Sequence, residues 1–256
     1  MRLRPLFAAA VWGVTLASAP VDAEPVKVLF QEGVTRGFPV LRSLAGDKLA
    51  QGDLAQVARG DRVDSRMTFR FSDGSLYDEH VVFSQAGLFT LLSYRIVQRG
   101  PSFPETIEAS FDRESGRYAV RYRADDESPE EILTGRLALP PDVYNGMLSL
   151  VVKNLPRQAA TSVQIIAFTP QPRLVKMQLL PVGDDAQRVS DAALPVARWI
   201  IRPQLGLFAS LLVADVPDVN CWIVRGSRLR SSRPRAPSTS RAPSGGSSRI
   251  DRRGGR

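Results

Sequence analysis

The chain has one cysteine, Cys221, and one histidine, His80. A single cysteine excludes an internal disulfide, so stability must come from core packing. One histidine, without paired Cys or His spacing, excludes a structural zinc site. The sequence also has no Gly-x-Ser-x-Gly nucleophile turn, no phosphate loop and no dinucleotide fingerprint. It therefore names no catalytic residue, no metal ligand and no cofactor, and a hydrolase using carboxylates or His80 is kept only as a third hypothesis.

The folded part of the chain lacks excess positive charge. Residues 226–256 hold nine Arg and eight Ser against one acid, Asp251, and their charge of +8 equals the net charge of the whole chain. Residues 1–225 therefore sum to zero. This composition predicts a disordered Arg/Ser-rich tail. Two origins stay open: a frameshift product of GC-rich coding DNA, or a genuine basic tail that binds anionic lipid or polysaccharide.

Apolar runs long enough to span a membrane are missing as well. Arg2 and Arg4 precede an apolar stretch over residues 6–19, and Val21-Asp22-Ala23 has the small residues of a cleavage site. This pattern predicts a signal peptide over residues 1–23, cleaved after Ala23. The apolar stretch is shorter than the ~20 residues of a membrane anchor, and no transmembrane segment is expected after cleavage. We expect a periplasmic or secreted bacterial protein with a single β-rich domain over residues 24–225.

Alternation with a period of two residues dominates the first two thirds of the chain, and residues 62–71 show it most clearly. One face of this predicted strand carries Val63, Ser65, Met67, Phe69 and Phe71, and the other carries Arg62, Asp64, Arg66, Thr68 and Arg70. Further strands are predicted over residues 26–30, 38–41, 49–58, 76–85, 88–98, 106–111, 117–123, 132–139, 163–169, 174–180 and 197–201. Cys221 is interpreted as a small buried residue of a last strand over residues 220–224, the alternative being an intermolecular disulfide.

Two segments depart from this strand pattern. Apolar residues recur at helical spacing after Pro140-Pro141, which predicts a helix over residues 142–154, although Asn145-Gly146 within it is typical of a hairpin. A second short helix is predicted over residues 205–213. The fold class is therefore mainly β (α+β): a curled antiparallel meander that forms a half-barrel or barrel, with one or two helices on its concave side.

The Asp73-Gly74 hairpin decides which side chains face the interior. A two-residue loop would turn Asp78 and His80 toward the apolar face, where they would be a polar handle in a cavity. A three-residue loop would place them on the arginine face and bury Tyr77, Val81 and Phe83, and we favour it because it buries more apolar area. The candidate ligand-binding residues are Met67, Phe69, Phe71, Asp78, His80 and Met147.

The remaining charged groups indicate no catalytic pair and no nucleic-acid surface. Adjacent acids, at residues 125–127, 130–131 and 184–185, lie beside Ser, Pro or Gly and are interpreted as solvated loops. Arg117, Arg121 and Arg123 share a strand face without aromatic residues among them. Because bases stack on aromatic rings, this face does not predict nucleic-acid binding.

Several strings resemble an uncharacterised family of secreted bacterial proteins. They are Asp73-Gly74-Ser75-Leu76-Tyr77-Asp78-Glu79, Phe83-Ser84-Gln85, Gln98-Arg99-Gly100-Pro101-Ser102-Phe103-Pro104, Leu139-Pro140-Pro141-Asp142 with Asn145-Gly146-Met147, and Pro172-Arg173-Leu174-Val175-Lys176. More distantly, a curled sheet with a helix on its hollow side is similar to the periplasmic lipoprotein-carrier fold, whose members hold acyl chains. The resemblance implies an apolar cavity but assigns no residue a role.

These observations favour an exported, non-catalytic binding protein that shelters an apolar ligand such as a lipid in a β-cup. The alternative is a structural or interaction module of the cell envelope with a packed core. The oligomeric state is not predicted.

Overall fold

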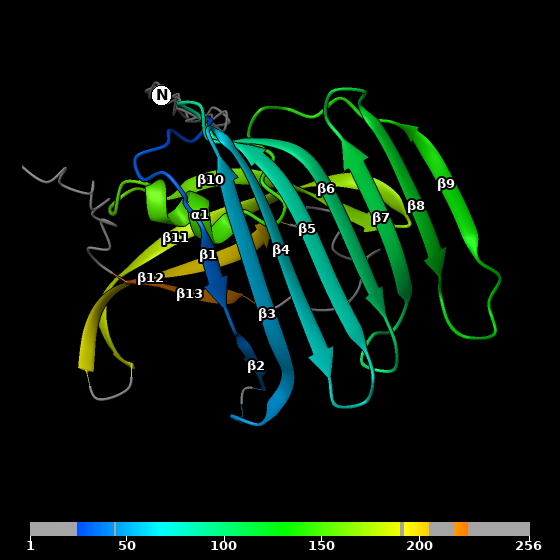
Figure 1. Cartoon of the computed structure of the whole chain (residues 1–256), viewed down its shortest axis with the longest axis horizontal. Coiled ribbons are helices and arrows are strands. Elements are labelled where there is room, and N and C mark those ends of the chain that lie inside the picture. Colours follow the sequence, from blue (N-terminus) through cyan, green and yellow to red (C-terminus); the bar gives the residue numbers. More distant parts are fainter. Residues whose placement is uncertain (1–24, 44, 190–191, 205–217, 225–256) are drawn as a thin grey trace, which may run out of the picture. The chain divides into compact units, whose positions relative to one another are not determined.

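The computed structural model describes residues 25–43, 45–189, 192–204 and 218–224, all of which belong to the unit Met1–Gly226. They form two antiparallel sheets and one helix (Figure 1). The large sheet has nine strands: β1 (Thr35–Gly37), β2 (Val40–Arg42), β3 (Lys48–Arg59), β4 (Arg62–Phe71), β5 (Leu76–Ser84), β6 (Thr90–Arg99), β7 (Thr106–Asp112), β8 (Arg117–Arg123) and β9 (Glu131–Arg136). The small sheet has β10 (Thr161–Thr169), β11 (Gln171–Val189), β12 (Ala192–Gln204) and β13 (Val219–Val224), and α1 is Leu148–Asn154.

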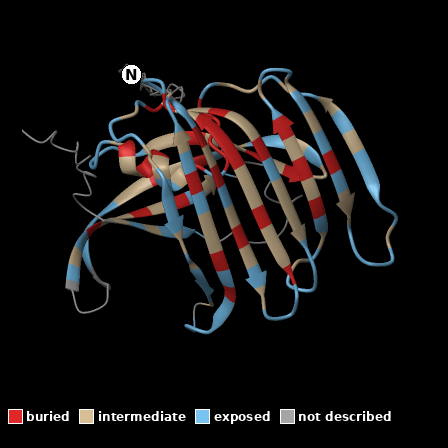
Figure 2. Ribbon diagram, in the orientation of Figure 1, coloured by how far each residue is buried: buried red, intermediate tan, exposed pale blue. Residues whose placement is uncertain are grey.

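The large sheet is a meander in which β3 to β8 each pair with the next strand in the sequence, while β1 and β2 both pair with β3. Short turns join neighbouring strands, which is why sequence order and spatial order agree. Buried and exposed positions alternate along β3 and β4, as expected for a sheet with one covered and one open face (Figure 2).

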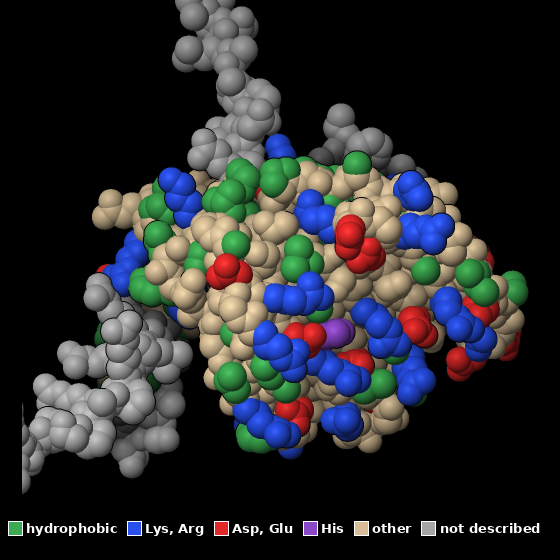
Figure 3. All heavy atoms as spheres, turned by 45° about the horizontal axis from the view of Figure 1, so that its top comes forward, with side chains coloured by type: hydrophobic (Ala, Val, Ile, Leu, Met, Phe, Trp, Pro, Cys, Tyr) green, Lys and Arg blue, Asp and Glu red, His purple; other side chains and the backbone are tan. Residues whose placement is uncertain are grey.

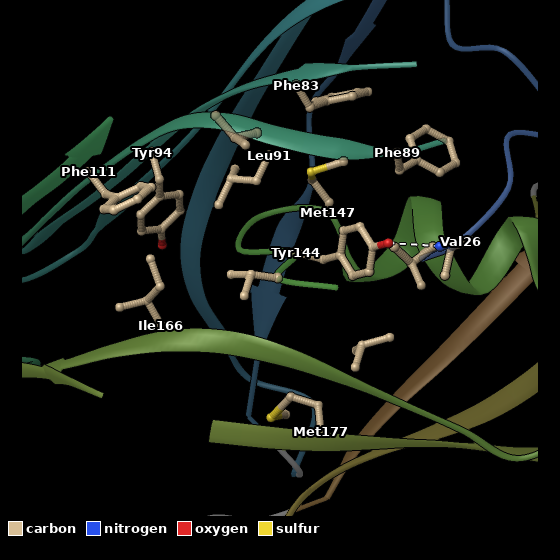
Figure 4. Close-up of a cluster of buried hydrophobic side chains, with 14 of the residues drawn as sticks. Val26, Phe83, Phe89, Leu91, Tyr94, Phe111, Tyr144, Met147, Ile166 and Met177 are labelled. Atoms are coloured by element: carbon tan, nitrogen blue, oxygen red, sulfur yellow. Dashed lines mark hydrogen bonds between the residues drawn. The ribbon is translucent and has the colours of Figure 1, made fainter. Parts of the chain in front are cut away.

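The covered face packs against the small sheet and α1 through one hydrophobic core. Its fully buried members include Phe83 and Phe89 from the large-sheet side, Met147 before α1, and Trp199 from β12. The rings of Tyr94 and Phe168 stack between the two sheets with centroids 6.1 Å apart. Figure 4 shows Phe83, Leu91 and Phe111 above this core and Ile166 and Met177 below it.

The segment before β1 is held by side chains of other elements and by two backbone hydrogen bonds, from the Val28 amide to Gly87 O and from the Phe89 amide to Val26 O. The Val26 amide donates to the Tyr144 hydroxyl at 2.8 Å, and the Leu29 and Phe30 amides both donate to Asn154 Oδ1. The predicted strand over residues 26–30 is therefore wrong, apart from an isolated bridge between Lys27 and Leu88.

Three other expectations need correction or fall outside the described residues. The described strands of neither sheet close into a barrel: the large sheet ends at β9, and a separate second sheet covers its face. The helix is shorter than predicted because residues 142–145 lie along β10, with the Gln164 amide donating to Asp142 O and the Tyr144 amide to Gln164 O. The signal peptide, the helix predicted over residues 205–213 and the tail after residue 225 lie outside the described residues. Within the described part, no helix has the length and apolar character needed to cross a bilayer.

Candidate functional site

The hairpin between β4 and β5 has the three-residue loop that the apolar pattern favours. The Phe71 amide donates to Ser75 O at 3.0 Å, Gly74 in the loop has φ +88°, and the ladder then pairs Arg70 with Leu76 and Arg66 with His80. Tyr77, Val81 and Phe83 consequently lie on the covered face with Phe69, Ser65 and Val63 as their partners. This register decides the position of every side chain on β5.

Asp78 and His80 therefore lie on the open face, away from the three apolar candidates of β4. The Asp78 carboxylate accepts two hydrogen bonds from Arg66, at 2.8 and 2.7 Å, and one from Thr68. His80 Nε2 lies 3.0 Å from Asp64 Oδ1. Both residues are engaged by neighbours on their own face, so the hypothesis of a polar handle formed by this pair inside the cavity is wrong.

The other four candidates occupy the covered face but do not converge on one site. Met67, Phe69 and Phe71 are half-buried, and the Phe71 ring packs edge-on against Phe103 with centroids 5.3 Å apart. Met147 is fully buried in the core. Whether any of the six residues contacts a ligand stays a prediction.

The acidic residue that β5 places on the covered face is Glu79. Its carboxyl accepts a hydrogen bond of 2.7 Å from the Tyr94 hydroxyl, and it lies between Met67 on β4 and Ile96 on β6. Burial raises the pKa of Glu79, and the hydrogen bonds from Tyr94 and Tyr77 only partly oppose this shift. Burial likewise raises the pKa of Tyr77 and of Tyr94, with the Glu79 charge adding to both shifts. The neutral form of the cluster is therefore favoured.

Glu79 was missed because the sequence analysis searched for clustered acids and motifs. The alternation of residues 77, 79, 81 and 83 contains the necessary signal, since Glu79 is the one acid in a run that is otherwise apolar or aromatic. A lone carboxyl at a core-facing strand position must find hydrogen-bond donors or become neutral.

Glu79 borders a cleft of about 290 Å³ between the two sheets. Its walls are mainly apolar and come from β5, β6, β7, β10 and the start of α1: Tyr77, Glu79, Tyr94, Ile96, Gln98, Ile107, Asn145, Gly146, Leu148, Ile165, Ile166, Ala167 and Phe168. Figure 4 shows Tyr94 directed from the large sheet across the core toward Ile166 on β10. The cleft is thus an apolar recess with one carboxyl and two phenol groups on its large-sheet wall.

The Asn145-Gly146 turn fixes one end of this cleft. Asn145 donates to Ile166 O at 2.8 Å and accepts from the Ile166 amide at 2.7 Å. Its side chain therefore satisfies both backbone groups of Ile166 at the edge of β10. Gly146 has φ +65°, and a Cβ there would lie 3.3 Å from the Glu79 carboxyl carbon and from Val81. The turn therefore needs glycine, and it holds the start of α1 against the Glu79 wall.

Metal binding finds no support in the described residues, where no group of three or more His, Cys, Asp or Glu side chains is arranged to hold an ion. Cys221 is a half-buried free thiol on β13, and burial raises its pKa, which disfavours the reactive thiolate.

Comparisons with protein-family models, curated proteins and solved structures gave no match to this chain. The functional conclusion therefore depends on the geometry of the described residues.

Proposed function

We propose that this is an exported, non-catalytic binding protein that takes the apolar part of a ligand such as a lipid into the cleft between its two sheets. One observation carries this proposal: the cleft combines apolar walls with the Glu79–Tyr94 hydrogen bond, the pairing of surfaces that an amphipathic ligand needs.

The apolar walls supply the binding energy in this proposal. Ile96, Ile107 and Leu148 contribute aliphatic surface, and Phe168 contributes an aromatic face. Displacing water from such surface stabilises a complex by roughly 25 cal/mol per Å². A volume of about 290 Å³ lies near the lower end of the range of small-ligand sites, so the cleft suits a small ligand or the apolar part of a larger one.

The Glu79 cluster would orient the ligand. Because burial raises the Glu79 pKa, the carboxyl is a hydrogen-bond donor as well as an acceptor over a wider pH range than an exposed glutamate. It suits a neutral polar group such as an ester or alcohol. A second ionised carboxylate in the same cleft would be disfavoured by repulsion.

The composition of the cleft supports a binding function rather than a catalytic one. The described lining contains one carboxyl group and no Ser, Cys, His, Lys or Arg. A carboxylate mechanism of glycosidase type needs a pair of acids, and nucleophilic catalysis needs a nucleophile with a base beside it.

The test compares two tryptophan substitutions on β6. Ile96→Trp should fill the cleft, whereas Val97→Trp places the same ring on the open face of the same strand. The full chain, purified without denaturant, is analysed by native mass spectrometry, lipid extraction and titration with the neutral probe N-phenyl-1-naphthylamine. We expect co-purifying lipid or probe binding in the wild type and in Val97→Trp, and its loss in Ile96→Trp.

Absence of both lipid and probe binding in the wild type would overturn the proposal, as would equal binding by the two variants. That result would favour the second candidate, an interaction module of the cell envelope. The specific observation in favour of that alternative is the tight filling of the rest of the interior, where Phe83, Phe89 and Leu91 have no exposed surface.

A further inference from the structure

The open face of the large sheet carries a second concavity, which shares only Tyr94 with the lining of the cleft between the sheets. This outer hollow has a volume of about 810 Å³ and extends over β5 to β9. The strand register places its charged and hydroxyl side chains on the face opposite Glu79, and three of the polar ones are short: Ser93, Ser110 and Thr134. Because these side chains are short and the neighbouring arginines are long, the space of the hollow above them is left open.

Arginines surround this hollow. Arg95, Arg117 and Arg136 all contribute to its lining, together with His80, while Asp112 is the one acid among the lining residues. Figure 3 shows Lys and Arg side chains gathered around the histidine on this face, with acidic groups between some of them.

Several polar and charged groups near the hollow already have hydrogen-bond or ionic partners. Arg95 pairs with Glu108 at 2.7 Å, and His80 lies against Asp64. The Asp112 carboxylate accepts hydrogen bonds from the amide and the hydroxyl of Ser115, at 2.8 and 2.6 Å. Glu108, Asp64 and Asp112 therefore already interact with other side chains of the protein.

Arg117 and Arg136 differ from the other charges of the hollow. They are direct cross-strand partners between β8 and β9, and both are exposed on the same face. Within the described part of the chain, neither guanidinium forms an ion pair or a side-chain hydrogen bond. Like charges directly opposite each other destabilise a strand pair. A site preformed for an anion carries this destabilisation of the strand pair as long as it is empty.

The shape and chemistry of the hollow narrow the class of ligand. Two planar guanidinium groups match the geometry of a carboxylate, and the floor hydroxyls of Ser93, Ser110 and Thr134 can donate and accept hydrogen bonds. Phe111 and Tyr118 also border the hollow, but the strand register directs both rings toward the covered face, where they pack on the core. No aromatic ring therefore lies among the arginines of the open face as a platform for a base. Its concavity also suits a discrete molecule better than a flat bilayer surface.

We propose that the outer hollow binds an acidic saccharide, with a sugar carboxylate held between Arg117 and Arg136 and sugar hydroxyls on the serine and threonine floor. The volume lies within the range of small-ligand sites. The uronate charge relieves the repulsion between the two arginines, so binding stabilises the β8–β9 pair.

The experiment titrates the full chain with trigalacturonate and, as a neutral match of equal ring number, maltotriose, by isothermal calorimetry. The key variant is Arg117→Gln with Arg136→Gln. Its control is Arg62→Gln with Arg99→Gln, which removes the same charge from exposed positions of the same sheet face outside the hollow. We expect trigalacturonate binding to fall at least about tenfold in the key variant and to change less than about twofold in the control.

Stability gives a second readout. The free key variant should unfold at a higher temperature than the wild type because the repulsion is gone. Trigalacturonate should raise the unfolding temperature of the wild type and of the control variant but not that of the key variant. Thermal unfolding also identifies a variant that fails to fold. In that case Arg136→Glu is used, because it replaces the repulsion across the strands with attraction, and it should abolish binding in a stable protein.

Four results would overturn the proposal: no binding of trigalacturonate, equal binding of maltotriose, equal losses in the two double variants, or binding only to vesicles that contain phosphatidylglycerol. Equal losses would assign the binding to net charge, to which residues 226–256 contribute most.

Discussion

Asp78 and Glu79 are adjacent on β5, yet their carboxyl groups lie on opposite faces of the large sheet and their pKa values are displaced in opposite directions. Hydrogen bonds from Arg66 lower the pKa of Asp78, whereas burial raises the pKa of Glu79. The period-two geometry of a strand is sufficient to separate them. One carboxylate thus supports a charged outer surface, and the other lies in the cleft, where burial favours its neutral form.

Replacing Glu79 with Gln should make the protein less sensitive to rising pH. The folded pKa of Glu79 lies above its unfolded value of about 4.3, so the folded state binds more protons between the two pKa values. The wild type therefore loses stability as pH rises through that interval, and Glu79→Gln does not. Urea unfolding of both proteins at about pH 4, 6 and 8 measures this, and a stability difference that stays constant with pH would contradict it.

Tyr94→Phe provides the companion variant. It removes the hydrogen bond that favours ionised Glu79, so the Glu79 pKa should rise further and the loss of stability with pH should extend to higher pH. Removing a buried hydrogen bond costs about 1 kcal/mol even where Glu79 is neutral.

Asp78→Asn should show the opposite pH dependence. The folded pKa of Asp78 lies below its unfolded value of about 3.9, so its contribution is present above that pH and is lost as pH falls through the folded pKa. The wild type should exceed Asp78→Asn in stability most at neutral pH, and the difference should shrink as pH falls below the unfolded value of about 3.9. Denaturant unfolding across this range is the measurement. An equal difference at about pH 3 and 7 would mean that shape, and not charge, accounts for the effect.

Asn145→Ala should be among the more damaging polar substitutions. It leaves both backbone groups of Ile166 without the partners they have in a buried environment. Each unsatisfied group costs about 1–3 kcal/mol, so we expect a loss of roughly 2–5 kcal/mol in urea unfolding. Asn220→Ala is the control, because Asn220 accepts hydrogen bonds only from exposed Arg198. A similar small effect in both variants would show that water replaces the Asn145 contacts.

Gly100→Ala and Gly74→Ala should separate backbone strain from steric clash. Both glycines have positive φ, +103° and +88°, but a Cβ at Gly100 would lie 2.7 Å from Ser75 Cα, whereas nothing lies within 4 Å of one at Gly74. Gly74→Ala should cost about 1 kcal/mol from its backbone alone. Gly100→Ala should cost a further ~1–3 kcal/mol because a backbone atom must move. Thermal unfolding of the two variants gives the difference, and equal shifts would exclude the clash.

Strand positions were predictable where local pattern and turn chemistry agree. Residues 62–71 and 117–123 have the predicted bounds, because alternation specifies the covered face and short turns with Gly60, Gly74 and Gly116 lie at three of the four strand ends. The three-residue loop at Asp73 also followed from the sequence, since it buries more apolar surface than its alternative.

The helix shows where local pattern is insufficient. Residues 142–147 have helical spacing, but their backbone and the Asn145 side chain bond to β10, a partner about twenty residues later in the sequence. Tertiary hydrogen bonds that bury polar groups outweigh the small helix propensities of such a segment.

The sequence by itself determined an antiparallel meander with one apolar and one arginine-rich face, because the side-chain period of a strand is independent of its surroundings. Only the tertiary structure decided that a second sheet covers the first, that Glu79 lies in the resulting cleft, and that Arg117 on β8 lies directly opposite Arg136 on the neighbouring β9. These relationships depend on packing between sheets and on strand register across turns, and their free energy comes from contacts that no local pattern contains.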